Sequence, residues 1–356
     1  MRYVTKRLLQ ASFTFFAALT ISFLLYRMMP GGPIQAMVAE RYGSCIQNAG
    51  DAACNIDEIR EQVRLMVNID PEQPIPEAYV DYLYRVIVHQ DFGNSVDQQE
   101  PVFGILFSAM PWSVFISIHG LVLGWIFNIF WGSAMAYNEG SRFDKVATII
   151  SMVGNSIPYY VAAIIALAFL GFEFGLFPQG GRFPDTIMID FPLIGALVNT
   201  PNVVPGFNIP FMFGVTWSAA LPVFTGFVLG INGLGMRGNA IRVIESDYNR
   251  VARLRGLSQM RIATRYVGRN AILPIYTGFM IGIASIFGSG IIMERIFSYQ
   301  AVGWYTFRAL VLRDYPLLMG TFMFYTAVTI IGILIADFTY GLIDPRASKG
   351  GGTDEY

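Results

Sequence analysis

Charged residues are scarce in this sequence, and lysine is nearly missing. Only 14% of the 356 residues are charged and 54% are hydrophobic, whereas a soluble domain is charged at about a quarter of its positions. The lysines are Lys6, Lys145 and Lys349, and none of them has the glycine-rich spacing of a Walker A phosphate loop. The composition therefore indicates an integral membrane protein without an ATP-binding loop of its own.

Side chains suited to catalysis or metal binding are equally few. The histidines are His89 and His119, and the cysteines are Cys45 and Cys54. No cluster has the spacing of metal ligands, and no Ser/His/Asp arrangement is indicated. We therefore expect no catalytic residue, no metal and no cofactor, which disfavours a membrane-embedded enzyme. The positive residues follow membrane topology, so nothing indicates nucleic-acid binding.

Long apolar segments predict an all-α polytopic membrane protein with six transmembrane helices and both termini in the cytoplasm. The predicted spans are residues 8–29, 111–137, 146–171, 213–235, 272–293 and 317–336. We interpret the first as a retained helix, and Ser156-Ile157-Pro158 interrupts the third. Three arginines fall outside as exceptions to the positive-inside rule: Arg295, Arg308 and Arg313. The adjoining Glu294 and Asp314 can compensate two of them.

A polar external segment, residues 31–103, separates the first two spans. Its periodicity predicts two amphipathic helices, at about 56–66 and 77–89. Cys45 and Cys54 both lie in this segment, where thiols tend to oxidise. Their spacing of nine residues therefore predicts a disulfide, and two unpaired thiols are the alternative.

The predicted spans hold almost no ionisable groups. Ion-coupled carriers usually place carboxylates or histidine relays inside the membrane, so an ion-coupled secondary transporter is the less favoured alternative. Polar side chains in the spans are candidates to line a solute pathway, although hydrogen bonds between helices explain each of them at least as well. These candidates are His119, Asn128, Asn155, Ser156, Asn232 and Ser285.

The most distinctive stretch is residues 236–274, which carries eight arginines between apolar segments. One arginine at a bilayer centre costs about 2.5–3.5 kcal/mol, so eight would cost on the order of 20 kcal/mol. The stretch must therefore stay in water, on the side where positive loops are retained. Its arginines are Arg237, Arg242, Arg250, Arg253, Arg255, Arg261, Arg265 and Arg269.

This arginine-rich stretch predicts two short helices with a break between them. Ser246 or Asp247 can cap the first helix, Gly256 can end it in a left-handed conformation, and Ser258 can cap the second. Apolar positions of the first helix recur near helical spacing at Ile244, Tyr248, Val251 and Leu254. The pattern indicates an amphipathic docking surface, and a basic anchor that only fixes topology is the alternative.

Residues 247–258, Asp-Tyr-Asn-Arg-Val-Ala-Arg-Leu-Arg-Gly-Leu-Ser, resemble the cytoplasmic loop motif of ABC importer permeases. Residues 269–274 are similar to the oligopeptide/dipeptide branch of that family. The usual Glu-Ala-Ala of the family appears here as Arg250-Val251-Ala252, so the match is partial at that point. Further matches follow in the order seen in peptide-type permeases, at residues 294–298, 303, 313–316 and 344–346.

The resemblance implies a type I ABC importer permease core that moves peptides or similar small solutes by alternating access. Its implied partners are a second homologous permease subunit, two ABC ATPase subunits that hydrolyse the ATP, an external substrate-binding protein and the lipid bilayer of a prokaryotic cell membrane. The ATPase-coupling residues would be Asp247, Arg250, Val251, Ala252, Arg255, Gly256, Leu257 and Ser258.

On this reading the chain divides into four parts. Residues 1–30 form the N-terminal tail and first helix, and residues 31–103 form the external segment. Residues 104–340 form the permease core with the other five helices and the coupling loop 236–272. Residues 341–356 form a cytoplasmic tail.

Overall fold

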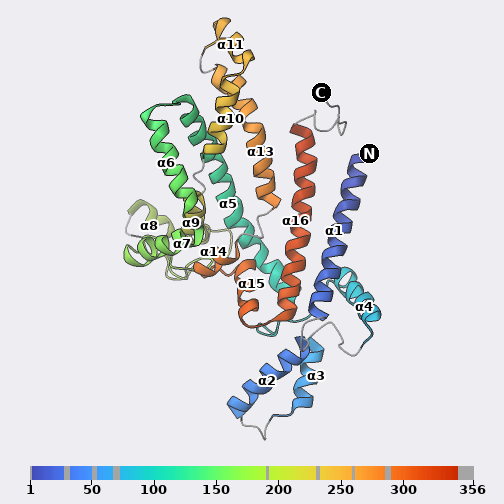
Figure 1. Cartoon of the computed structure of the whole chain (residues 1–356). Helices are drawn as coiled ribbons and strands as arrows, with labels where there is room; N and C mark the ends of the chain where they lie inside the picture. Colours follow the sequence, from blue (N-terminus) through green and yellow to red (C-terminus); the bar gives the residue numbers. More distant parts are fainter. Residues whose placement is uncertain are drawn as a thin grey trace. The chain divides into compact units, whose positions relative to one another are not determined.

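A computed structural model describes residues 2–27, 33–49, 54–66, 73–189, 192–229, 233–258, 261–284 and 290–343 (Figure 1). Within these ranges the regular secondary structure is helical, apart from isolated bridges between Asn94 and Pro101 and between Ile187 and Thr200. The chain divides into two compact units. The first unit is Met1–Ser113 with Ala301–Ile335, and the second is Val114–Gln300 with Ala336–Tyr356.

The first unit contains α1 (Arg2–Arg27), α2 (Pro33–Ala49), α3 (Ile56–Met66), α4 (Ile75–Val88), the start of α5 (Val102–Tyr137), α15 (Val302–Val311) and most of α16 (Tyr315–Ile343). The second unit contains the rest of α5, then α6 (Arg142–Ser156), α7 (Tyr159–Ala166), the π-helix η2 (Leu167–Glu173), α8 (Pro192–Val198), α9 (Ile209–Leu229), α10 (Leu234–Ile244), α11 (Asp247–Leu254), the π-helix η3 (Ile262–Gly268), α13 (Arg269–Ala284) and α14 (Ile291–Ile296).

Four described helices are long and apolar enough to cross a membrane: Thr5–Leu24, Val102–Tyr137, Ile209–Gly226 and Tyr315–Ile335. Large apolar side chains stay exposed on the helices, for example Phe130 at 72% and Ile149 at 60%, which is expected where lipid rather than water covers the surface. These features support an all-α polytopic membrane protein.

The third predicted span is a bent pair of helices rather than one rod. Arg142–Ser156 and Tyr159–Glu173 meet at an angle of 93°. The bend has a local cause, because Ile157 takes an extended backbone (φ −83°, ψ 121°) before Pro158, and the residue before a proline is disfavoured in the α region. If this pair counts as one span, the described helices supply up to five.

Only part of the fifth predicted span, residues 272–293, lies within the described residues. Most of that part is covered by α13, which is described from Arg269 to Ala284. Residues 285–289 lie outside the described residues. The total of six spans therefore stays a prediction.

The shorter helices of the first unit pack on its long helices. Leu19 and Phe23 of α1 share a buried cluster with Tyr82 of α4 and Met323 of α16. The ring of Phe23 lies 5.5 Å from that of Tyr82. The two amphipathic helices expected from periodicity are α3 and α4, and α2 is an additional helix that the sequence did not indicate.

A buried carboxylate ties together two distant parts of the first unit. Asp314 is fully buried and accepts hydrogen bonds from Ser95 Oγ (2.5 Å) and the Asp97 backbone N–H (3.1 Å). Arg308, which the sequence predicts to be external, pairs with Asp97, with Nε 2.6 Å from Oδ2. Compensation of Arg308 therefore comes from the turn before α5, while Asp314 holds backbone and hydroxyl groups instead.

Cys45 in α2 and Cys54 just before α3 form a disulfide in this structure, across a separation of nine residues. A loop of this size is worth about 2–3 kcal/mol in the chain-entropy description of disulfides. The bond therefore holds α2 against α3, which also pack together through Met37, Val38 and Val63 in one buried cluster.

We expect no reactive thiol in the denatured, unreduced protein. The double variant Cys45→Ser/Cys54→Ser should lower the local unfolding free energy of the α2–α3 pair by about 2–3 kcal/mol, measured by amide hydrogen exchange, while amides of α9 serve as the internal control. Two titratable thiols in the unreduced wild type would contradict the bond.

Candidate functional site

The arginine-rich stretch folds as α10, α11, η3 and the start of α13, with α11 at the tip beyond α10 (Figure 1). Its helices close over a small apolar cluster, the loop core, to which the end of α5 also contributes. The buried members of the loop core are Ala136, Met236, Ala240, Ala252, Ile262, Val267 and Ala271. This stretch is therefore a folded part of the second unit.

Helix α11 begins without its predicted side-chain cap. Ser246 occupies the N-cap position, but its hydroxyl donates to the Val243 carbonyl (2.5 Å) and makes no cap hydrogen bond. Asp247 is the first helical residue and so is not the cap. The Asn249 amide donates to Ser246 Oγ (3.2 Å) and to the Val243 carbonyl. The start of α11 is thus fixed by bonds back to the end of α10.

The end of α11 agrees with the sequence. Gly256 has a left-handed backbone (φ +71°), and its N–H donates to the Arg253 carbonyl at 2.9 Å. The Leu257 N–H reaches the Ala252 carbonyl at 3.3 Å. The second helix is the π-helix η3 from Ile262, preceded by a backbone bond from Ile262 to the Ser258 carbonyl.

Helix α11 does not bury its apolar stripe as an ordinary amphipathic helix does. Asn249 and Ala252 face inward and are buried, whereas Tyr248, Val251 and Leu254 are exposed by 43%, 46% and 81%. The apolar stripe therefore points away from the loop core. It lies among the exposed arginines Arg250, Arg253 and Arg255. We call these six residues the α11 face.

The sequence-predicted coupling residues divide between the two sides of α11. Asp247, Arg250, Val251, Arg255, Gly256 and Ser258 are exposed, and Leu257 is half-buried. Ala252 differs, because it is only 3% exposed and packs in the loop core. Its small size serves the packing beneath α11, where a larger side chain would collide with the chain itself.

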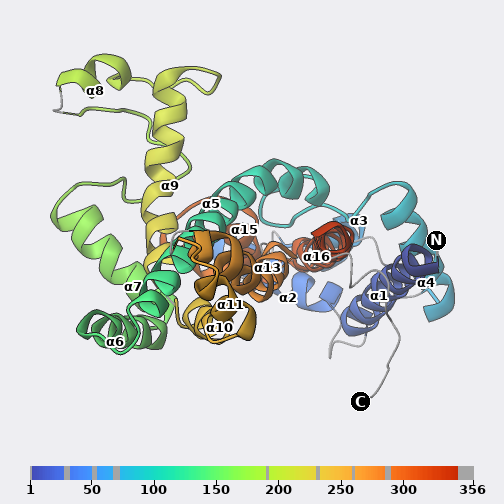
Figure 2. The ribbon, with the colours of Figure 1, turned by 90° about the horizontal axis from the view of Figure 1, so that it is seen from above.

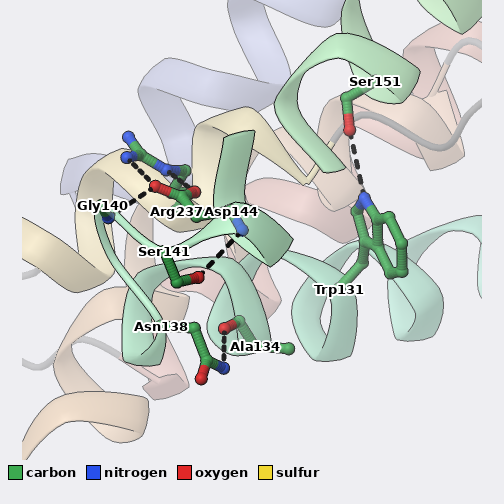
Figure 3. A network of polar contacts seen from close by, with 8 residues as sticks. All are labelled: Trp131, Ala134, Asn138, Gly140, Ser141, Asp144, Ser151 and Arg237. Carbon is green, nitrogen blue, oxygen red and sulfur yellow. Dashed lines mark hydrogen bonds and ion pairs between the residues drawn. The ribbon is translucent and has the colours of Figure 1, made fainter. Parts of the chain in front are cut away.

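An ion pair connects α10 to the first turn of α6 (Figure 3). Arg237 binds the Asp144 carboxylate with two bonds, Nε to Oδ1 at 2.6 Å and NH2 to Oδ2 at 2.7 Å. The Gly140 N–H donates to the same carboxylate at 3.0 Å. The Asp144 side chain is 5% exposed, and a buried carboxylate of this kind depends on its partner for compensation.

The sequence did not indicate this pair. Topology alone accounts for Arg237 as one of eight arginines in its stretch, and Asp144 lies between the basic residues Arg142 and Lys145. Ninety-three residues separate the partners, so only the fold brings them together. A weak signal exists, since Asp144 is an isolated acid in the first turn of α6.

A cavity of about 630 Å³ lies within the second unit, among α5, α7, α9, α13 and α14. Its wall is largely apolar, with the rings of Trp125, Tyr159 and Phe279, and with Asn128 and the buried Glu294 as polar members. Four glycines of the wall border open space, because a Cβ added to any of them would meet nothing within 4 Å: Gly120, Gly124, Gly226 and Gly278. The Trp125 indole N–H is buried without a hydrogen-bond partner among the described residues.

One of the predicted pathway residues, Asn128, lines this cavity. His119 is exposed, with Nδ1 2.6 Å from the Phe115 carbonyl. Asn155 and Ser156 are exposed at the end of α6, where the Ser156 hydroxyl donates to Met152. Asn232 and Ser285 lie outside the described residues.

The aromatic and glycine residues of the cavity wall are absent from the residues predicted to line the pathway. The glycine pairs 120/124 and 278/282 recur every four residues, which places each pair on one face of its helix. That spacing was an available signal for close helix packing or open space.

The sequence of this chain matches a known protein family. Residues 128–349 match the family described as binding-protein-dependent transport system inner membrane component. The chain belongs to this family. The resemblance to ABC importer permeases is thereby confirmed, and this family member is a multi-pass membrane transport component.

Relatives align along nearly the whole of this inner membrane component. The dipeptide transport system permease protein DppB of Haemophilus influenzae is 29% identical over 350 residues, 97% of this chain and 98% of the relative. The inner membrane ABC transporter permease protein YejB of Escherichia coli O157:H7 is 27% identical over 370 residues, with 97% and 98% covered. DppB of Bacillus subtilis is 25% identical, with 97% of each chain covered.

Gly256 provides a test of how the loop is built. An added Cβ would meet nothing within 4 Å, so only the backbone conformation opposes a side chain. A left-handed backbone costs an L-residue about 1–2 kcal/mol, and asparagine tolerates it better than a β-branched residue.

We expect Gly256→Val to speed amide exchange in α11 by roughly five- to thirtyfold, and Gly256→Asn to change it much less. The measurement is hydrogen exchange of the protein in lipid nanodiscs, with α9 as the unaffected reference. Equal exchange in the two variants would argue against a left-handed helix end.

Proposed function

We propose that this chain is a transmembrane permease subunit of an ATP-driven ABC importer, which moves peptides delivered by an external binding protein. The observation that carries the proposal is the α11 face. It exposes an apolar stripe among arginines, on a helix held by its own packed core. The family description and the relatives named as dipeptide permeases support the same reading.

The α11 face has the properties of a docking surface. Leu254 is 81% exposed, and burying a leucine side chain fully contributes about 1.5–3 kcal/mol. A small apolar centre with charged residues around it is typical of interface hot spots. Because the arginines keep this region in water, the partner is a soluble subunit on the cytoplasmic side, and we assign it as an ABC ATPase.

The cavity of the second unit is the proposed solute route. Its volume of about 630 Å³ lies within the range of small-molecule sites, about 300–1,000 Å³. Asn128, Tyr159 and the Trp125 N–H, which is unpaired among the described residues, supply hydrogen-bonding groups for a peptide backbone, and the apolar wall accepts side chains. Glycine-rich helices can approach each other closely, which suits a route that opens and closes by alternating access.

The remaining features follow from the same proposal. The chain would cross the prokaryotic cell membrane six times with both termini in the cytoplasm. It would pair with a second homologous permease subunit above two ATPase subunits. The external segment with α2, α3 and α4 would lie on the side that receives the binding protein.

An ion-coupled secondary transporter is the second candidate, and one observation favours it. The Glu294 carboxylate is 3% exposed and lines the cavity, as proton- or sodium-coupling groups often do. Membership of a binding-protein-dependent family and the α11 face weigh against it. An ion-driven carrier has no ATPase subunit, so it would not need the α11 face as a docking surface.

We expect Leu254→Asp to weaken retention of the ATPase subunits by about tenfold or more, because a charge replaces the apolar centre of the contact. Leu254→Met is the matched control and should retain them, because it keeps an apolar side chain of similar volume. The measurement is co-purification of the ATPase subunits together with substrate uptake. Wild-type values of both for Leu254→Asp would exclude α11 as the docking surface.

A further inference from the structure

We propose that Arg237 and Asp144 are positioning residues that transmit movement of α11 to α6 and from there to the cavity wall. The inference rests on the proposed function, because it takes the ATPase to act on α11. It goes beyond that function by assigning the link between the docking helix and the solute route.

The ion pair is built for a fixed geometry. Two hydrogen bonds of 2.6 and 2.7 Å join the guanidinium to both carboxylate oxygens, the fork arrangement that only arginine provides. The turn fixes the acid as well, since the Gly140 N–H binds the carboxylate and Ser141 Oγ accepts from the Asp144 N–H (Figure 3). The contact therefore transmits displacement in either direction.

Neither membrane topology nor the helix dipole requires an arginine at position 237. It is the fourth residue of α10, near the positive end of the helix dipole, where a cation is disfavoured. Seven other arginines of the same stretch retain the loop in water. Asp144, in the first turn of α6, stands where an acid is favoured. The placement of Arg237 is explained by its partner.

A close crossing of α5 and the chain entering α10 lies beside the ion pair. A Cβ added to Gly132 would collide with the Gly233 carbonyl and lie 2.6 Å from Met236 Cβ. Two helical elements in contact through their backbones have no side chains between them to absorb sliding. This crossing serves as a pivot, and Arg237 belongs to it, because its backbone N would lie 2.9 Å from the same added Cβ.

The path continues from α6 to the cavity. Trp131 of α5 donates to Ser151 Oγ of α6 at 3.1 Å, which keeps α6 alongside α5. After the bend at Pro158, α7 begins with Tyr159, a residue of the cavity wall. A push on α11 turns α10 about the crossing, and the ion pair displaces the start of α6. The far end of that helix carries the displacement to Tyr159.

The test compares uptake with ATP hydrolysis in proteoliposomes that contain the whole complex of permeases, ATPases and binding protein. Arg237→Gln and Asp144→Asn should retain the ATPases and hydrolyse ATP, while uptake per ATP falls about tenfold, within the usual range of coupling between sites. Arg237→Lys keeps the charge but loses the fork, so its ratio should lie between wild type and Arg237→Gln.

Arg242→Gln is the matched control. It removes one exposed positive charge from the same helix without touching the pair, and it should keep the wild-type ratio. The exchanged pair Arg237→Asp/Asp144→Arg should recover part of the ratio lost by the single variants, which a purely local loss of charge does not predict.

Two results would overturn the inference. One is a wild-type ratio of uptake to ATP hydrolysis in both Arg237→Gln and Arg237→Lys. The other is a proportional fall of uptake and hydrolysis, which means that the pair only stabilises the fold. If Arg237→Gln does not yield folded protein, Arg237→Lys decides by the same criterion. Failure of the proposed function looks different, because the wild-type complex would then show no ATP-dependent uptake.

Discussion

The cost of placing arginine in hydrocarbon governs this structure. Residues 236–274 carry eight arginines, which the bilayer excludes, so the stretch must fold in water against the end of the bundle. It does so over the loop core, from Ala136 of α5 to Ala271 of α13. The Arg237–Asp144 pair fastens this folded loop to α6. The arginine-rich stretch, which cannot enter the membrane, is thus packed against α5 and α13, two of the helices that line the cavity.

Features with a strong local cause could be predicted from the sequence. The helix of residues 56–66 follows from apolar periodicity with acids in its first turn, and it forms between those residues. Gly256 ends α11 in the left-handed conformation that its position indicated. The break at Pro158 was expected from the proline itself. Family membership followed from motifs spread along the chain, because each short motif keeps its order relative to the others.

Features that depend on long-range packing could not be predicted. Periodicity marks Tyr248, Val251 and Leu254 as one stripe, but it does not say that the stripe faces outward while Ala252 faces the core. The angle of 93° between the halves of the bent pair and the partner of Arg237 depend on how distant segments meet. Polarity in the spans marks pathway candidates in the sequence, whereas apolar side chains, glycines and aromatic rings make most of the cavity wall.

Energy coupling is the central claim, and transport by the reconstituted complex tests it most directly. Labelled dipeptide uptake would be followed in proteoliposomes with ATP on the side of residues 236–272 and binding protein on the opposite side. The account predicts uptake that requires both ATP and binding protein and that persists when ionophores collapse every ion gradient. Uptake driven by a proton or sodium gradient without ATP would contradict it and would assign the buried Glu294 to ion coupling instead.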